Sequence, residues 1–222
     1  MRSMTESNLA VRPGDHPVHG TWLSVDVVAL TDDPEPQVAL IKRAGAPHKG
    51  ATTLPGGLLA AWEGETIEQA ARRIMREKAG TELSGGVVVV SVVSDPGRDE
   101  RGHTVSIVVL TRVPAGVLSA VPVTQIPDKM PFGHTAMVRT ALQRLQERLL
   151  VDPETSLAML GQETTRTQVR ALLGACGPIN VTTAGKRLER SPLYRRTKEL
   201  RKPVPTGRPG HVYRFLPPEI GD

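Results

Sequence analysis

Aromatic side chains are scarce in this sequence, since Phe, Trp and Tyr together make up 3% of its 222 residues. A core must therefore be built from Val, Leu, Ile and Ala, and a sheet of stacked aromatic rings that would hold single-stranded RNA is disfavoured. The single cysteine, Cys176, excludes an internal disulfide. We expect this cysteine to pack in a helix rather than to react.

Long apolar runs are also lacking, because none approaches the roughly 18–20 residues that a membrane-spanning helix needs. The first residues are polar and contain proline, unlike the apolar centre of a signal peptide. We expect a soluble, cytoplasmic protein in which residues 1–19 form a flexible arm.

Acidic residues are sparse at one end of the chain. Residues 164–222 hold 12 Lys and Arg against 4 Asp and Glu, a balance of +8, whereas residues 1–163 hold 16 against 19, a balance of −3, and the two sum to +5. This concentration of positive charge predicts an anionic polymer as the partner of the C-terminal quarter.

The most patterned stretch covers residues 54–82. Paired glycines at 56 and 57 and a Gly64-Glu65 turn precede a predicted helix, with Thr66 as its N-cap and Gly80 at its left-handed C-terminal position. Apolar residues recur at helical spacing, namely Ile67, Ala70, Ala71, Ile74 and Met75. The stretch predicts a loop, a helix and a second loop, with charge on the open face.

These residues resemble the Nudix box of enzymes that hydrolyse nucleoside diphosphates linked to another moiety. Arg73 matches the arginine of the box and Glu77 the first of its paired glutamates, but Ile74 and Lys78 occupy the positions of two other glutamates. Two extra residues also follow Gly57. Because Mg²⁺ or Mn²⁺ needs several carboxylates on one helical face, we expect a degenerate box that has no catalytic residue, metal ligand or cofactor but keeps ligand binding.

The segments around this box predict a sheet and a second motif. Strands are predicted over 22–30, 37–43, 87–94 and 104–113, the first two as a hairpin-like pair. The loop over 95–103 resembles the Pro-x-Arg-Asp-x-Arg-Gly loop of ADP-ribose-handling Nudix proteins and of Nudix-type regulators of NAD metabolism. Its Arg98 and Arg101 either bind a diphosphate or pair with the neighbouring acidic residues and shape the turn.

Residues 130–150 resemble the Phe-Asp-His element and the last helix of the Nudix domain in the same regulators. Phe132, Gly133 and His134 match that element, and a helix with Ala141, Leu142, Leu145 and Leu149 on one face follows it. We expect His134 to cap or pack rather than to catalyse.

The basic C-terminal quarter predicts a winged helix-turn-helix. Helices are predicted over 164–176 and 181–188, a third over 191–202 that Ser191 and Pro192 open, and then a turn and a strand over 211–216. The third helix is expected to lie in the major groove of DNA. The alternative is a solvated basic face on a helical appendage. The expected DNA contacts are Thr182, Thr183, Lys186, Arg187, Ser191, Tyr194, Arg195, Arg196, Lys198, Arg201, Lys202, Arg208 and His211.

Taken together, the residues and the resemblance predict an α+β chain. A Nudix-like mixed β-sheet with flanking helices over 20–152 is followed by a linker over 153–163 and a winged helix-turn-helix over 164–222. The resemblance implies a bacterial homodimeric regulator, expected to act as a repressor, that binds a palindromic double-stranded DNA operator and senses ADP-ribose or a related NAD metabolite. The ligand residues carried over by position are Arg43, Gly56, Gly57, Glu65, Arg73, Glu77 and Arg98.

Two other functions stay open. One is an active hydrolase of ADP-ribose-like substrates, with a metal site rebuilt from Glu63, Glu65 and Glu77. The other is a ligand-blind DNA binder in which the Nudix domain serves only as a dimer scaffold.

Overall fold

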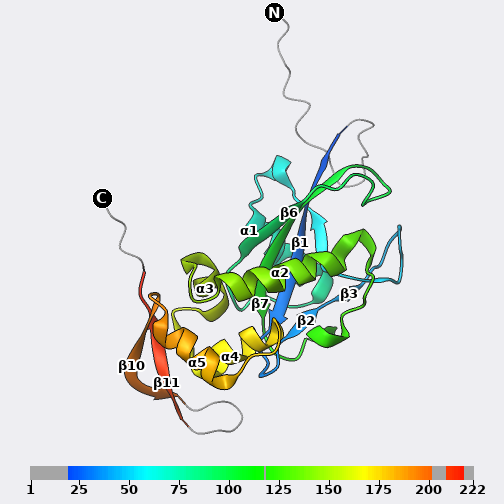
Figure 1. The fold of residues 1–222 in the computed structure, drawn as a ribbon. Coiled ribbons are helices and arrows are strands. Elements are labelled where there is room, and N and C mark those ends of the chain that lie inside the picture. Colours follow the sequence, from blue (N-terminus) through cyan, green and yellow to red (C-terminus); the bar gives the residue numbers. More distant parts are fainter. Residues whose placement is uncertain (1–19, 118, 202–208, 218–222) are drawn as a thin grey trace, which may run out of the picture.

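The computed structural model describes residues 20–117, 119–201 and 209–217 (Figure 1). The arm expected over 1–19 lies outside these residues, as do Lys202 and Arg208. Among the described residues, none of the helices is both long and apolar enough to cross a membrane.

The N-terminal part is built on a mixed six-stranded sheet with the order β6-β7-β1-β2-β8, to which β5 adds by pairing with β1. The central strands β1 and β7 run parallel, in register from Trp22 opposite Thr104 to Thr31 opposite Val113. The strands are β1 (Trp22–Thr31), β2 (Gln37–Ala39), β5 (Gly56–Leu58), β6 (Val88–Val93), β7 (Thr104–Val113) and β8 (Ala120–Pro122). A separate pair consists of β3 (Ile41–Lys42) and β4 (Thr52–Thr53). The four predicted strands are thus confirmed, with 37–43 divided between β2 and β3.

Helices cover both faces of this sheet, because successive side chains of β1 point to opposite sides. Val27 and Ala29 pack with α1 (Ile67–Ile74), whereas Val28 and Leu30 pack with α2 (His134–Arg148). Figure 1 shows α2 crossing the sheet on the side opposite α1. The result is a three-layer sandwich with a core on each face of the sheet.

Helix α1 begins as the sequence predicts. Thr66 and Gln69 form a reciprocal capping box, and the apolar stripe buries Ala70, Ala71 and Ile74. The helix continues as a π-helical turn, η3 (Met75–Ala79), and ends at Gly80, whose φ of 65° is left-handed. The i→i+5 hydrogen bonds of such a turn change the positions of its side chains around the helix axis, relative to an α-helix. Here the turn carries Glu77 and Lys78.

The C-terminal part has the element order of a winged helix. It contains α3 (Pro153–Leu160), β9 (Glu163–Thr165), α4 (Arg166–Ala175), α5 (Val181–Arg190), β10 (Tyr194–Arg201) and β11 (Gly210–Phe215). The strands form a sheet in the order β10-β11-β9. Residues 153–160, within the segment expected to be a linker, form helix α3, whose Thr155, Met159 and Leu160 are buried.

The third helix expected over 191–202 is wrong for the described part of this range, because Tyr194–Arg201 forms strand β10. The expected helical stripe fails at Leu200, which is 60% exposed. Tyr194 instead pairs with Phe215 and Arg196 with Tyr213 across the sheet. Pairing with β11 therefore outweighs the helix propensity of the Arg, Lys, Glu and Leu residues in this stretch.

The two parts share one continuous core. The cluster that begins at Val28 and Leu110 in the large sheet runs through Leu145 of α2 to Leu173 of α4 and Leu188 of α5. Hydrogen bonds reinforce this junction. Arg187 Nη2 donates to the carbonyl oxygens of Gln146 (2.9 Å) and Leu149 (3.3 Å), and Ser191 Oγ donates to that of Leu150 (2.7 Å).

Candidate functional site

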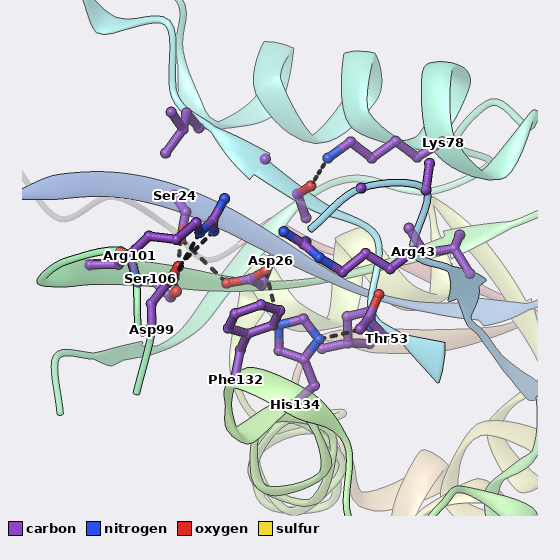
Figure 2. A pocket seen from close by; sticks show the side chains of 18 of the residues that line it. Ser24, Asp26, Arg43, Thr53, Lys78, Asp99, Arg101, Ser106, Phe132 and His134 are labelled. Carbon is purple, nitrogen blue, oxygen red and sulfur yellow. Dashed lines mark hydrogen bonds and ion pairs between the residues drawn. The ribbon is translucent and has the colours of Figure 1, made fainter. Parts of the chain in front are cut away.

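A cavity of about 450 Å³ opens beside β1 and β5 (Figure 2). Residues of the turn η3 and of the segments that follow β3 and β6 complete its wall. This volume lies within the usual range for small-molecule sites. Five cationic side chains and three carboxylates line it, a balance of +2, from Lys42, Arg43, Lys78, Arg98 and Arg101 against Asp26, Glu77 and Asp99. The cavity thus favours an anionic ligand.

Buried polar groups form one wall of the cavity. The backbone N–H of Leu54 donates to Nδ1 of His134 at 3.0 Å, so the proton of the neutral ring lies on Nε2. That nitrogen faces Oδ1 of Asp26 at 3.4 Å. His134 therefore packs in the wall of the cavity and contacts Asp26 in the described structure.

Asp26 stays ionised in spite of its burial. Burial alone would raise the pKa of this carboxyl, but the hydrogen bonds from His134 and Ser106 and the charge of Arg98 lower it. The carboxylate is thus a fixed negative charge within a cationic cavity.

The paired glycines let the backbone of β5 approach this carboxylate. A Cβ placed on Gly56 would lie 2.1 Å from Oδ1 of Asp26, and one on Gly57 would lie 3.2 Å from Cγ1 of Ile74. Any side chain at Gly56 would collide with Asp26. Close packing at the edge of the cavity therefore requires glycine at 56, whereas a side chain at 57 would need Ile74 to shift.

The loop after β6 presents its arginines to the cavity in two different ways. Arg98 donates to the carbonyl oxygens of Phe132 (2.9 Å) and Thr104 (3.2 Å) and to Oγ of Ser106 (2.6 Å). Arg101 forms a two-pronged pair with Asp99, at 2.9 and 2.6 Å. Burial opposes the ionised form of Asp99, but the hydrogen bonds from Arg101 lower its pKa. Both arginines line the cavity, and diphosphate binding by them stays a prediction.

Phe132 forms an aromatic surface at the cavity, with a positive φ of 59° that is rare for a residue with a bulky side chain. The guanidinium of Arg43 lies 4.9 Å from its ring centroid and that of Arg101 5.7 Å. These cation–π contacts hold two arginines on one ring.

The side chains of the helix that matches the Nudix box contact other parts of the protein. Arg73 binds Glu65 through two hydrogen bonds of 2.6 and 2.9 Å, and the hydrogen bond from Arg73 lowers the pKa of Glu65. Ile74 is fully buried. Nζ of Lys78 donates to the carbonyl oxygen of Gly56 (Figure 2).

The divalent cation that the Nudix family implies does not fit these residues. An ammonium and an alkyl group stand at two of the carboxylate positions, and Glu65 already accepts from Arg73 and from the N–H of Ala60. Within residues 20–117, 119–201 and 209–217, no three His, Cys, Asp or Glu side chains group as a metal would require. Only Glu77 remains of the carboxylates matched on this face.

Most of the ligand residues predicted from the sequence come together. Arg43, Gly56, Gly57, Glu77 and Arg98 line the cavity. Glu65 and Arg73 pair with each other, and Arg73 donates to the carbonyl oxygen of Leu58 at 3.0 Å. The pair therefore holds the end of β5 in place.

Sequence reasoning missed several residues of the cavity wall. Asp26 carried a usable signal, because it is a carboxylate within the otherwise apolar strand β1. Lys78 and Phe132 lie within the matched motifs but were not expected to line the site, whereas Ser24 and Ser106 converge only in three dimensions.

The predicted DNA contacts fall into three groups. Exposed side chains on α5 or β10 are Thr182, Thr183, Lys186, Arg195, Arg196, Lys198 and Arg201. Residues that are not exposed and have internal hydrogen bonds are Arg187, Ser191, Tyr194 and His211, and in the exposed group Arg196 and Arg201 also donate to His211 and Glu163. Tyr194 is buried and its hydroxyl donates to the carbonyl oxygen of Gly161 at 2.8 Å, while His211 accepts from Arg196. Lys202 and Arg208 lie outside the described residues.

The sandwich, the altered box and the appended winged helix define a Nudix fold joined to a helix-turn-helix unit. The model of the NUDIX domain family matches residues 20–131, which is 112 of the 222 residues. The chain belongs to the Nudix family.

Two solved structures of NrtR from Shewanella oneidensis match both parts of the chain. The complex with a 27mer DNA has 25% identity and a TM-score of 0.61 over 88% of this chain and 94% of that one. The second, a crystal structure of NrtR, has 26% identity to this chain, with the same TM-score and the same coverage of both chains. The predicted α+β arrangement and the resemblance to the Nudix-type regulators are thereby confirmed.

A curated relative matches the Nudix part alone. The ADP-ribose pyrophosphatase of Methanocaldococcus jannaschii is 39% identical over 98 residues, or 44% of this chain. The match spans 54% of that relative's length.

Proposed function

We propose that this protein is a DNA-binding transcriptional regulator, acting as a repressor, whose Nudix domain senses ADP-ribose or a related NAD metabolite without hydrolysing it. The observation that carries the proposal is the union of a cationic ligand-sized cavity and a winged helix on one continuous core. Residues 20–152 form the sensing domain and 164–222 the DNA-binding domain. The regulator works in the cytoplasm as a homodimer on a palindromic operator.

The cavity has the chemistry of a nucleotide diphosphate site. Arg43, Lys78 and Arg98 supply positive charge for phosphates, and Phe132 supplies an apolar ring. The match to a relative named ADP-ribose pyrophosphatase supports the choice of ADP-ribose as the first ligand to test.

Helix α5 is the element that we assign to the major groove. It is the second helix of the helix-turn-helix formed with α4, and in such motifs the second helix contacts base edges. Thr182, Thr183 and Lys186 on it are exposed. The assignment moves from the expected third helix to α5, while the exposed cations of β10 are assigned to phosphates.

Selection of genomic DNA fragments by the purified protein, followed by anisotropy titrations at fixed salt, tests this function. We expect one palindromic sequence to be enriched and ADP-ribose to weaken binding to it by about 5- to 150-fold, the usual range for coupled sites. Recovery of DNA fragments that share no sequence would contradict the assignment of a sequence-specific DNA-binding domain. A sequence-specific complex that ADP-ribose leaves unchanged would instead favour the ligand-blind DNA binder.

A second candidate function is hydrolysis of ADP-ribose-like substrates, which the match to the pyrophosphatase favours. Glu63, Glu65 and Glu77 are the carboxylates available for a rebuilt metal site. Release of AMP from ADP-ribose with Mg²⁺ or Mn²⁺ measures this activity. Turnover that is lost in Glu77→Gln would overturn the sensor proposal, and we expect no such turnover.

A further inference from the structure

Lys78 places a positive charge at the position where the family resemblance puts a metal-binding carboxylate. Its ammonium group donates to the carbonyl oxygen of Gly56 at the cavity wall. The same nitrogen would lie 3.5 Å from a Cβ on Gly57. The side chain therefore turns over the paired glycines instead of extending into solvent.

We infer that Lys78 replaces the divalent cation of the Nudix family, so that the cavity binds the diphosphate of its ligand directly and without metal. This inference rests on the proposed function, because it requires a diphosphate-containing ligand in this cavity. It adds that the loss of catalysis and the gain of metal-free binding arise from the same substitution.

The surroundings of Lys78 support this replacement. Figure 2 shows Lys78 from η3 and Arg43 from the segment after β3 entering the same cavity. Two cations from different elements can flank a diphosphate, which carries charge on both of its phosphoryl groups. A divalent ion in the same space would be repelled by both side chains.

The proximity of Lys78 to Arg43 has an electrostatic cost that an anion between them would reduce. Although Lys78 as a residue is exposed, its ammonium group is partly desolvated, and this desolvation together with the charge of Arg43 lowers its pKa. A diphosphate beside the ammonium would favour its charged form. Ligand binding is therefore expected to be stronger for having Lys78 in place.

The carboxylates nearby do not offer a competing metal site. Glu77 has its carboxylate 3.7 Å from Nη1 of Arg73, and Glu65 is held by the same arginine at 2.6 Å. Asp26 lies beneath Gly56 and faces His134. Each of these carboxylates already faces a partner in the protein.

Calorimetric titration of the full-length protein with ADP-ribose, in EDTA and separately in Mg²⁺, tests the inference. We expect the same dissociation constant in both buffers. Lys78→Gln should weaken binding by about 10- to 100-fold, as for loss of a charge-assisted hydrogen bond. Lys78→Arg should bind within a few-fold of the wild type. Lys129→Gln is the matched control, because Lys129 is exposed and does not line the cavity.

The outcomes separate this inference from the proposed function. Binding that requires Mg²⁺, or Lys78→Gln binding as tightly as the wild type, would overturn the role of Lys78 and leave the sensor intact. Lys78→Glu should lose metal-free binding more severely than Lys78→Gln, and thermal melting of each variant checks that it folds.

Inorganic pyrophosphate provides a second probe that does not depend on the identity of the nucleotide. If ADP-ribose fails to bind but pyrophosphate binds in EDTA through Lys78, the inference holds and the choice of effector is wrong. If neither probe binds to the wild type, both the inference and the sensor proposal fall.

Discussion

Asp26 lies at the centre of the cavity's polar wall although it belongs to a strand that is otherwise almost wholly buried and apolar. A carboxylate in such a strand is costly unless charged or hydrogen-bonding partners surround it. Here His134 and Ser106 come from segments far along the chain. Its position in β1 was readable from the sequence, but its partners were not, because they depend on how β7 and α2 pack against β1.

Replacing Asp26 by Asn tests the value of this fixed charge. Its pKa in the folded protein is below 3.8, so its ionised form stabilises the fold above pH 3.8 and this contribution is lost as pH falls through the folded-state pKa. Asp26→Asn should lower the free energy of unfolding by ~1–3 kcal/mol at pH 7. The gap from the wild type should narrow below pH 3.8, as measured by urea denaturation across this range.

The control for this experiment is Asp128→Asn, because the side chain of Asp128 is fully exposed. It should change stability little at any pH. A gap between Asp26→Asn and the wild type that stays constant as the pH falls would show that shape, and not charge, accounts for the loss.

Cys176 illustrates a residue whose predicted role follows from its surroundings. Its Sγ donates to the carbonyl oxygen of Leu172 at 3.3 Å, and burial raises the pKa of the thiol to about 12. At pH 8 the thiolate fraction should be about 10³-fold lower than for a thiol of pKa 9.0. Ellman's reagent should therefore react slowly with the native protein and rapidly after unfolding. Fast stoichiometric labelling of the native protein would contradict this packing.

At the scale of elements, local pattern was sufficient where side chains alternate and insufficient where a strand has few apolar residues. β1 and β7 are rich in β-branched residues and could be predicted with their approximate bounds. β10 has only Tyr194 buried along its length, so its sequence carries no alternation. Its conformation is decided by pairing with β11, and the pattern of one strand does not reveal which segment will pair with it.

Helix α2 links the two proposed sites physically. Its first residue, His134, borders the ligand cavity, while the carbonyl oxygens of Gln146 and Leu149 at its other end accept from Arg187 of α5. A rigid helix transmits displacement along its axis when the elements at its two ends have alternative positions. We expect ligand-dependent movement of Phe132 and His134 to reach α5 through this helix.

Removing the Arg187 contact tests this coupling. Arg187→Met keeps an apolar stem but loses both hydrogen bonds to α2. The ratio of DNA dissociation constants with and without ADP-ribose should shrink by at least ~5-fold, whereas ADP-ribose affinity in the absence of DNA should change little. Anisotropy and calorimetry give the two quantities.

The matched control for Arg187→Met is Arg190→Met, an exposed residue of the same helix. It should leave the ratio unchanged even if it weakens DNA binding. Equal ratios in Arg187→Met and the wild type would exclude α2 as the route of coupling.

At the scale of the whole molecule, the order of units could be predicted from the sequence and the convergence of side chains could not. The Nudix resemblance placed the paired glycines and Glu77 in one site, and these positions do line one cavity. Lys78 was visible as a departure from the family pattern, but its hydrogen bond to Gly56 depends on β5 lying against the π-helical turn. The partner of each side chain is a property of tertiary packing.

The distribution of charge over the whole molecule predicts two different effects of protein substitutions on DNA binding. If α5 lies in the major groove, Lys186→Ala should cost ~1–3 kcal/mol on the selected operator and relax the preference at one base position. If β10 lies along the DNA backbone, Arg195→Ala should weaken binding to all sequences evenly. It should also reduce the slope of log K against log salt concentration by about 1, as for the loss of one phosphate contact.

Titrations of operator and scrambled DNA over a series of salt concentrations distinguish the two effects. Arg139→Ala is the control, because its exposed side chain lies on α2 of the Nudix part. A loss of base preference in Arg195→Ala with none in Lys186→Ala would assign recognition to the strand instead of the helix. Because only base contacts discriminate between sequences while phosphate contacts set the salt dependence, the pair of variants identifies the DNA-reading element.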